Sequence, residues 1–203
     1  MPEDCLNPGD AAMARYARGE RAAFAEVYDA VVPRIFPYLR RQTGSLVQAE
    51  DVLQQTLFHM HRGAGTFVPG SAVLPWAFAI ARRLLVDERR RARRNVLSTA
   101  TEIDAHDLAS PIHAGPDGEA SAKELAGSLQ RALQALPASQ REAFELVRLD
   151  GLSLPEAAAV VGVSVSALKF RAHRALVAMR AAVLTARGIL ADELDDAGPV
   201  SVR

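Results

Sequence analysis

Apolar residues recur every three or four positions along most of this 203-residue chain, which is the spacing of helices that bury one face. Stretches that alternate apolar and polar residues, as strands do, are nearly missing, and Ala, Leu and Arg dominate the composition. Two of the helical series are Phe24, Val27, Tyr28, Val31 and Val52, Leu53, Leu57, Met60. The pattern predicts an all-α protein.

The helical pattern lapses between Asn95 and about Glu119, where Ser, Thr, Pro, Gly and acidic residues replace the periodic apolar positions. This composition is typical of a flexible linker. We therefore expect two small helical domains. The predicted boundaries are an N-terminal extension over 1–19, a helical domain over 20–94, an acidic linker over 95–120, a second helical domain over 121–187 and an acidic tail over 188–203.

The sharpest local pattern lies over residues 153–180. Ser153 and Glu156 have the spacing of a capping box, with Pro155 in the first turn, so a helix is predicted to begin there. Gly162 is expected to end it in the left-handed conformation, and Ser164 can cap a second helix. The residues of this second helix expected to face the core are Val165, Leu168, Ala172, Leu176 and Met179. The order indicates a helix-turn-helix, with a plain helical hairpin as the alternative.

The formal net charge is zero, from 24 basic and 24 acidic side chains, but the charges are segregated. Between Gly162 and Arg187 every charged residue is basic, and a second cluster of Arg residues lies between Arg82 and Arg94. The predicted linker and tail are acidic. This asymmetry favours local contact with nucleic acid rather than a uniformly basic binding surface.

A further set of features precedes the Arg cluster. Residues 49–58 predict a helix with an acidic start and a polar surface at Gln54 and Gln55. A Gly-rich stretch over 62–74, expected to be a loop that orders on binding, and then Trp76 follow. Each feature alone also fits an ordinary core helix or a solvated face. Together they favour single-stranded nucleic acid, which binds to aromatic stacking surfaces and phosphate-neutralising cations.

Several functions are disfavoured by what the sequence lacks. Met1 is not followed by a basic and then an apolar run, no apolar stretch is long enough to span a bilayer, and Cys5 stands alone. His59 and His61 form an isolated pair without zinc spacing, and no phosphate loop or catalytic set of side chains occurs. We therefore expect a cytoplasmic protein that is not an enzyme and uses no metal, cofactor or small-molecule substrate.

Three of these motifs, in their order, resemble the extracytoplasmic-function (ECF) group of bacterial RNA polymerase sigma factors, over about residues 20–94 and 125–180. "AEDVLQQTLF" from Ala49 is similar to the helix that docks on the clamp coiled coil of core RNA polymerase. "PWAFAIARRLLVDERRRARR" from Pro75 is similar to the region that melts the promoter and recognises its −10 element. "LPASQREAFELVRLDGLSLPEAAAVVGVSVSALKFRAHRAL" from Leu136 is similar to the reader of the −35 element.

The resemblance implies a role in transcription initiation for each set of residues. The polymerase contact would be formed by Glu50, Asp51, Gln54, Gln55 and Phe58. The opened non-template strand, one of whose bases is flipped into a pocket in relatives, would be held by Phe67, Ser71, Trp76, Arg82, Arg83, Arg89 and Arg90. The −35 element would be contacted by Ser166, Lys169, Phe170, Arg171, His173 and Arg174.

The partners implied by the resemblance are core RNA polymerase, promoter DNA and an anti-sigma factor. The run "ALKFRAHRA" resembles a subset of the group whose anti-sigma factors are embedded in the membrane. Two positions depart from the common pattern. Arg83 stands where many relatives carry Asn, so the base preference at the downstream element is expected to differ from theirs. Phe170 stands where small residues are common.

Two other classes of protein remain as alternatives. A helix-turn-helix repressor or response-regulator-like output module would account for residues 153–180, but it would leave the Arg cluster and the Gly-rich stretch without a role. Such proteins also usually bind DNA as dimers. A helical protein-interaction scaffold would account for the helices alone. Binding to core polymerase separates a sigma factor from both.

Overall fold

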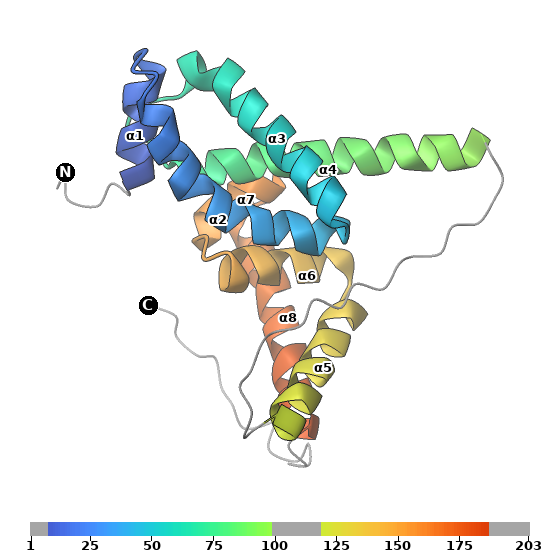
Figure 1. Cartoon of the computed structure of the whole chain (residues 1–203). Coiled ribbons are helices and arrows are strands. Elements are labelled where there is room, and N and C mark those ends of the chain that lie inside the picture. Colours follow the sequence, from blue (N-terminus) through green and yellow to red (C-terminus); the bar gives the residue numbers. More distant parts are fainter. Residues whose placement is uncertain (1–7, 99–118, 187–203) are drawn as a thin grey trace. The chain divides into compact units, whose positions relative to one another are not determined.

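The computed structural model describes residues 8–98 and 119–186, with the backbone alone for 93, 95–98, 119–124 and 186. Every regular element in these ranges is a helix, which confirms the all-α prediction. The elements are α1 (Pro8–Ala17), α2 (Ala23–Thr43), α3 (Leu46–Gly63), η1 (Ala64–Thr66), α4 (Val73–Ser98), α5 (Glu119–Ala135), α6 (Ala138–Phe144), η2 (Glu145–Leu149), α7 (Leu154–Val161) and α8 (Val165–Ala186) (Figure 1). By contacts, the described residues form two units, 8–98 with 152–164 and 119–151 with 165–186.

Helix α2 is central to the first unit, because it packs against α1, α3 and α4 (Figure 1). The Tyr38 ring meets the Phe78 ring of α4 edge-on, with the centroids 5.2 Å apart. Tyr28, which belongs to one of the predicted apolar series, is 44% exposed. The remaining buried side chains of α2 recur at helical spacing and are Ala23, Val27, Val31, Ile35 and Leu39.

The chain reverses between α2 and α3 over two residues. Gly44 ends α2 with a left-handed φ of 74°, and its N–H donates to the carbonyl of Arg40 at 3.0 Å. Ser45 then caps α3, because its hydroxyl accepts from the Gln48 N–H. This short turn brings α3 back along α2, where the two helices pack.

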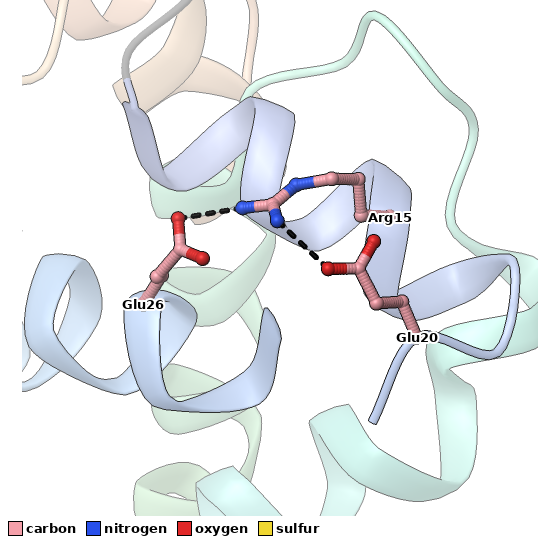
Figure 2. Close-up of polar contacts among 3 residues, drawn as sticks. All are labelled: Arg15, Glu20 and Glu26. Atoms are coloured by element: carbon pink, nitrogen blue, oxygen red, sulfur yellow. Dashed lines mark hydrogen bonds and ion pairs between the residues drawn. The ribbon is translucent and has the colours of Figure 1, made fainter. Parts of the chain in front are cut away.

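Helix α1 lies within the predicted N-terminal extension and was not expected as a packed element. Its Met13 and Ala12 are fully buried, and α1 packs against α2. Arg15 pairs with Glu20 at 2.9 Å and with Glu26 at 2.6 Å, across the turn into α2 (Figure 2). The hydrogen bond to Glu26, together with the attraction of both carboxylates, raises the pKa of Arg15 above its usual value.

A buried carboxylate ties α1 to the start of α4. Asp10 is only 7% exposed, and its Oδ1 accepts from the Val73 N–H at 2.7 Å. The first N–H groups of a helix have no partner within the helix, and the helix dipole favours a negative charge beside them. Asp10 therefore caps α4 from a helix that lies 63 residues earlier in the chain.

Helix α4 is buried along one face of its N-terminal half and charged in its C-terminal half. The buried residues recur at helical spacing and are Val73, Ala77, Phe78, Ala81 and Leu85. The helix continues to Ser98, so the first four residues of the predicted linker are helical. Glu119 and residue 120 likewise belong to α5. Residues 99–118, Cys5 and the predicted tail over 188–203 lie outside the described residues.

In the second unit, α8 packs against α5 and α6. One cluster of this core contains Leu136, Ala175 and Met179, with Leu129, Leu133 and Phe144 packed around it. Helix α6 continues into the π-helical turn η2, which ends at Leu149. The predicted core face of α8 is confirmed at Leu168 and Met179, but Val165 is 44% exposed because it lies at the first, outward-facing position of the helix.

The local signals around α7 are confirmed. Ser153 accepts from the Glu156 N–H, and the Glu156 carboxylate accepts from the Ser153 N–H at 2.8 Å, so both halves of the capping box are formed. Pro155 lies in the first turn. Gly162 ends α7 with a left-handed φ of 76°, and α8 begins three residues later at Val165. The chain thus has the element order of a helix-turn-helix.

We predict that Asp10→Ala lowers the free energy of unfolding by about 1–3 kcal/mol, because the buried Val73 N–H loses its acceptor. Asp10→Asn should lose less, since its side-chain carbonyl can still accept. Chemical denaturation monitored by circular dichroism measures both. Asp29→Ala is the matched control, since Asp29 is exposed on α2. Equal stability of Asp10→Ala and the control would contradict the capping role.

Candidate functional site

The outward face of α3 carries all five residues predicted to contact the polymerase. Glu50, Asp51, Gln54, Gln55 and Phe58 are exposed, and Phe58 is 55% exposed despite its apolar ring. The Gln55 amide donates to the Asp51 carboxylate at 2.8 Å, one helical turn away. These side chains therefore form one mixed polar and apolar surface that is free to bind a partner.

The opposite face of α3 fixes this orientation. Ala49, Val52 and Met60 are buried against the rest of the first unit. Thr56 is fully buried too, and its hydroxyl donates to the Val52 carbonyl at 2.7 Å, so no polar group is left without a partner there. Rotation of α3 to hide Phe58 would expose this apolar stripe, so the outward face is set by burial.

Two apolar side chains extend the outward face towards the start of α3. Val47 is 74% exposed and Leu46 is 51% exposed. At the other end, the Arg62 guanidinium lies over the Phe58 ring, 5.7 Å from its centroid. Val47 and Leu46 were not among the predicted contacts, although their apolar character next to a helix cap was visible in the sequence.

The predicted Gly-rich loop is shorter than expected, because α3 extends to Gly63 and η1 follows it over Ala64–Thr66. The irregular segment is therefore 67–72, just before α4. Ser71 is exposed in this segment, and so is Val68 at 65%. Together with Pro69 and Gly70, these residues form the accessible part of segment 67–72.

Phe67, expected at the nucleic-acid surface, is only 7% exposed. Its ring packs on the half-buried ring of Trp76, with the centroids 5.4 Å apart and the planes at 52°. Gly63 allows this arrangement, because a Cβ at that position would lie 3.3 Å from the Trp76 ring. Phe67 thus packs against one side of the Trp76 ring, and part of Trp76 stays accessible.

The arginines of α4 occupy different environments. Arg83 and Arg90 are exposed, whereas Arg82 is half-buried. Arg89 is exposed but donates to the backbone carbonyl of Gln42 at 3.0 Å and to its side-chain oxygen at 2.9 Å. Arg89 thus holds the C-terminal end of α2 against α4, which distinguishes it from its neighbour Arg90.

The exposed arginines continue beyond the predicted site. Arg83, Arg90 and Arg94 are spaced so that they share one face of α4, and Arg94 is exposed like the other two. Asp87 is half-buried on the same face, and its carboxylate partly offsets the charge of these arginines. Arg94 belongs to the basic run seen in the sequence but was left out of the predicted contacts. The face presents cations in a row, as binding to a phosphate backbone requires.

On α8, five of the six predicted contacts with the −35 element are exposed. Arg171 is half-buried, and Phe170 is 62% exposed. The Arg174 guanidinium lies over the Phe170 ring, 5.4 Å from its centroid. The other exposed members of the set are Ser166, Lys169 and His173. Because Leu168 and Ala175 are buried on the opposite side, this surface faces outward.

Within residues 8–98 and 119–186, no group of three or more His, Cys, Asp or Glu side chains is arranged to hold a metal ion. The helices in these ranges also include none with the length and apolar character needed to cross a membrane.

Comparison with protein families matches two segments of the chain. Residues 27–95, which contain α3 and most of α4, match Sigma-70 region 2. Residues 126–179, which contain α6, α7 and most of α8, match Sigma-70 region 4. The three candidate surfaces thus fall within the two matched segments.

Two solved structures have a similar fold. The sigma factor RpoE in complex with the anti-sigma factor NepR from Bartonella quintana aligns with a TM-score of 0.64 at 24% identity, over 82% of this chain and 97% of that one. CnrH in complex with the cytosolic domain of CnrY aligns with a TM-score of 0.61 at 24% identity, over 86% of this chain and 96% of that one. At this identity the likeness concerns the fold.

Curated relatives are similar over nearly their whole length. RNA polymerase sigma factor CarQ of Myxococcus xanthus is 34% identical over 166 residues, covering 80% of this chain and 90% of CarQ. ECF RNA polymerase sigma factor SigF of Caulobacter vibrioides is 36% identical over 173 residues, covering 83% of this chain and 90% of SigF. With both sigma regions present in order, the chain belongs to the ECF group of RNA polymerase sigma factors, which recognise promoters and are not enzymes.

Proposed function

We propose that this sigma factor divides its work among three outward helix faces, with α3 binding core polymerase, α4 holding the opened −10 strand and α8 reading the −35 element. The observation that carries the proposal is that burial turns these three faces outward, and all three lie in the family-matched segments. We propose the domain boundaries predicted from the sequence, 20–94 and 121–187, as the functional modules, with α1 packed onto the first.

The α3 face fits a helical partner. An interface gains most of its affinity from a few anchors that become fully buried, surrounded by polar contacts. Phe58 supplies an exposed apolar anchor, and Gln54 and Asp51 supply the polar contacts on the same face. Docking on the clamp coiled coil of core polymerase would cover this surface, which explains why a sigma factor keeps Phe58 in water.

The −10 surface combines a stacking ring with cations. Trp76 is held by Phe67 and remains partly accessible, and Arg83 and Arg90 lie exposed further along the same helix. Single-stranded DNA binds to such a combination by base stacking and phosphate neutralisation. Phe67 acts here by supporting Trp76, and Arg89 by holding α2 and α4 together.

The −35 surface lies on the N-terminal half of α8. In a helix-turn-helix, the side chains near the start of the second helix enter the major groove and contact base edges. Lys169 and Arg174 are the exposed cations at this place. Their donors suit guanine O6 and N7, which are the commonest specific contacts of basic side chains in the major groove.

An anti-sigma factor is the natural regulator of this arrangement. Among the solved structures with a similar fold, RpoE is a sigma factor bound to the anti-sigma factor NepR, and CnrH is bound to the cytosolic domain of CnrY. We propose that this chain works in the cytoplasm, where its polymerase and promoter are. We also propose that a membrane-embedded anti-sigma factor, of the kind that the "ALKFRAHRA" resemblance implies, covers its α3 face.

The match to both sigma regions excludes the repressor and scaffold alternatives, and the described surfaces agree with this. A one-domain helix-turn-helix protein would need neither the exposed anchor on α3 nor the paired rings before the α4 cations. A protein-interaction scaffold would not need a basic α8. Reconstitution with core RNA polymerase distinguishes a sigma factor from a repressor and from a scaffold. A sigma factor co-elutes with core as one copy and starts transcription at a specific promoter. A dimer that binds a palindromic site without core would instead support the repressor.

We predict that Gln54→Ala weakens binding to core polymerase by about 1 kcal/mol or more without changing helicity, because Gln54 is exposed and its loss leaves the α3 core intact. A fluorescence titration of labelled sigma factor with core gives the affinity. Gln134→Ala on α5 is the matched control, since it removes the same exposed side chain outside the α3 face. An affinity equal to that of the control would remove Gln54 from the interface.

We predict that Lys169→Ala and Arg90→Ala impair different steps. Lys169→Ala should weaken binding to the −35 element by about 1–3 kcal/mol. It should not change transcription from a preopened template that lacks this element. Arg90→Ala should impair use of the preopened −10 strand and spare binding to a −35 duplex. Run-off transcription on closed and preopened templates measures the split, with Arg131→Ala on α5 as the control cation. The same fractional loss on both templates for both variants would refute the separation.

We predict that Phe67→Ala lowers stability by about 3–5 kcal/mol and moves the emission of Trp76, the only tryptophan, to longer wavelength, because the supporting ring is lost. Phe67→Leu should keep most of the stability and most of the binding to the opened −10 strand. Fluorescence during denaturation and binding to a fork template provide both readings. Loss of strand binding in Phe67→Leu with native Trp76 emission would instead identify Phe67 as a direct DNA contact.

A further inference from the structure

An aromatic ring and an arginine form an exposed pair on the outward face of α8. Phe170 and Arg174 are four residues apart, so they lie one above the other on the helix. The Phe170 ring is 62% exposed, and the Arg174 guanidinium lies 5.4 Å from its centroid. This distance is within the range of a cation–π contact.

The pair does not belong to the hydrophobic core. Leu168, Ala175 and Met179 occupy the buried side of α8. Phe170 therefore has no packing role inside the second unit that would explain its size. The neighbouring outward positions are polar, with Lys169 and His173 on either side. A large apolar ring kept in water among polar neighbours indicates a surface that becomes covered when the protein binds.

We propose that Phe170 is a specificity-determining residue that packs against the C5-methyl group of a thymine in the upstream promoter element, and that its ring holds Arg174 against a guanine in a neighbouring base pair. The inference rests on the proposed placement of α8 in the major groove. It goes beyond that placement by assigning which bases this pair selects.

The chemistry of the two side chains leads to these two bases. A phenyl ring has no hydrogen-bonding group, and the only apolar group on a base edge in the major groove is the thymine methyl. A guanidinium matches the O6 and N7 acceptors of guanine with two parallel donors. Because the guanidinium lies directly over the ring, the two contacted base pairs must be close together in the stack.

The ring also prepares the arginine for binding. A free arginine side chain loses rotamer freedom when it is fixed against a base, and this loss weakens binding. Stacking on Phe170 restricts Arg174 before DNA arrives and leaves the N–H groups at the rim of the guanidinium available. The thymine contact and the guanine contact are therefore predicted to depend on each other.

The test uses the full chain bound to core polymerase and a promoter duplex that this holoenzyme selects from a pool randomised in the upstream element. Each thymine in the selected element is replaced in turn by deoxyuridine, which removes only the methyl group. At one position the wild-type holoenzyme should bind about fourfold more weakly, as expected for one buried methyl. Phe170→Ala should show no further loss from the same replacement.

The second arm tests the arginine. Replacing the neighbouring guanine by 7-deazaguanine removes the N7 acceptor and should weaken wild-type binding about fivefold or more. Phe170→Leu keeps an apolar contact for the methyl but has no aromatic face. It should therefore keep the deoxyuridine effect and lose most of the 7-deazaguanine effect. Val177→Ala, which shortens another exposed apolar side chain of α8, should behave as wild type in both arms.

Two results of the deoxyuridine arm would overturn the proposal. One is a selected element in which no thymine is sensitive to deoxyuridine, and the other is an equal sensitivity in wild type and Phe170→Ala. Weaker binding of Phe170→Ala to core polymerase without DNA would also overturn it, by showing that a protein covers the ring. If Lys169→Ala and Arg174→Ala leave binding to the upstream element unchanged, the proposed placement of α8 in the major groove is wrong. If these two variants lose binding but no thymine is sensitive to loss of its methyl group, only the role of Phe170 is rejected.

Discussion

The burial of one face of each helix is the constraint on which the functional surfaces depend. Helix α4 shows this most clearly, because Val73, Phe78 and Leu85 are removed from water against the rest of the first unit. A helix that is held along one stripe cannot rotate about its axis without exposing that stripe. The exposed directions of Arg83 and Arg90 are therefore consequences of apolar packing on the other side of the helix.

The same constraint explains how a protein with zero net charge can bind DNA. Its 24 basic and 24 acidic side chains cancel in sum but not in place. On the described part of α8 every charged side chain is basic, and the buried Leu168 and Ala175 fix the outward direction of the exposed ones. Since charges in water interact over only about 10 Å at moderate salt, the local arrangement decides what each face can bind.

The features that could be predicted from the sequence are those set by local chemistry. The capping box of Ser153 and Glu156 and the left-handed Gly162 depend only on neighbouring residues, and all three have the expected conformation. The features that could not be predicted depend on distant contacts. Asp10 caps a helix that begins at Val73, and nothing near Asp10 in the sequence indicates that partner. For the same reason the sequence predicts only an extension where α1 packs.

The limits for the candidate site have a related cause. The members of a run of arginines cannot be told apart by residue type. Arg89 nevertheless donates to Gln42 of α2, while Arg90 next to it makes no such contact and remains exposed. Position along a helix separates them, because neighbouring residues point about 100° apart and only one faces α2. Aromatic residues divide in the same way, since Phe67 is covered by Trp76 and Phe170 is not covered. A ring buried in the free protein stabilises it, whereas a ring left in water contributes its free energy only when a partner arrives. The difference between these two rings therefore separates the residue that we propose positions the site from the residue that we propose selects the ligand.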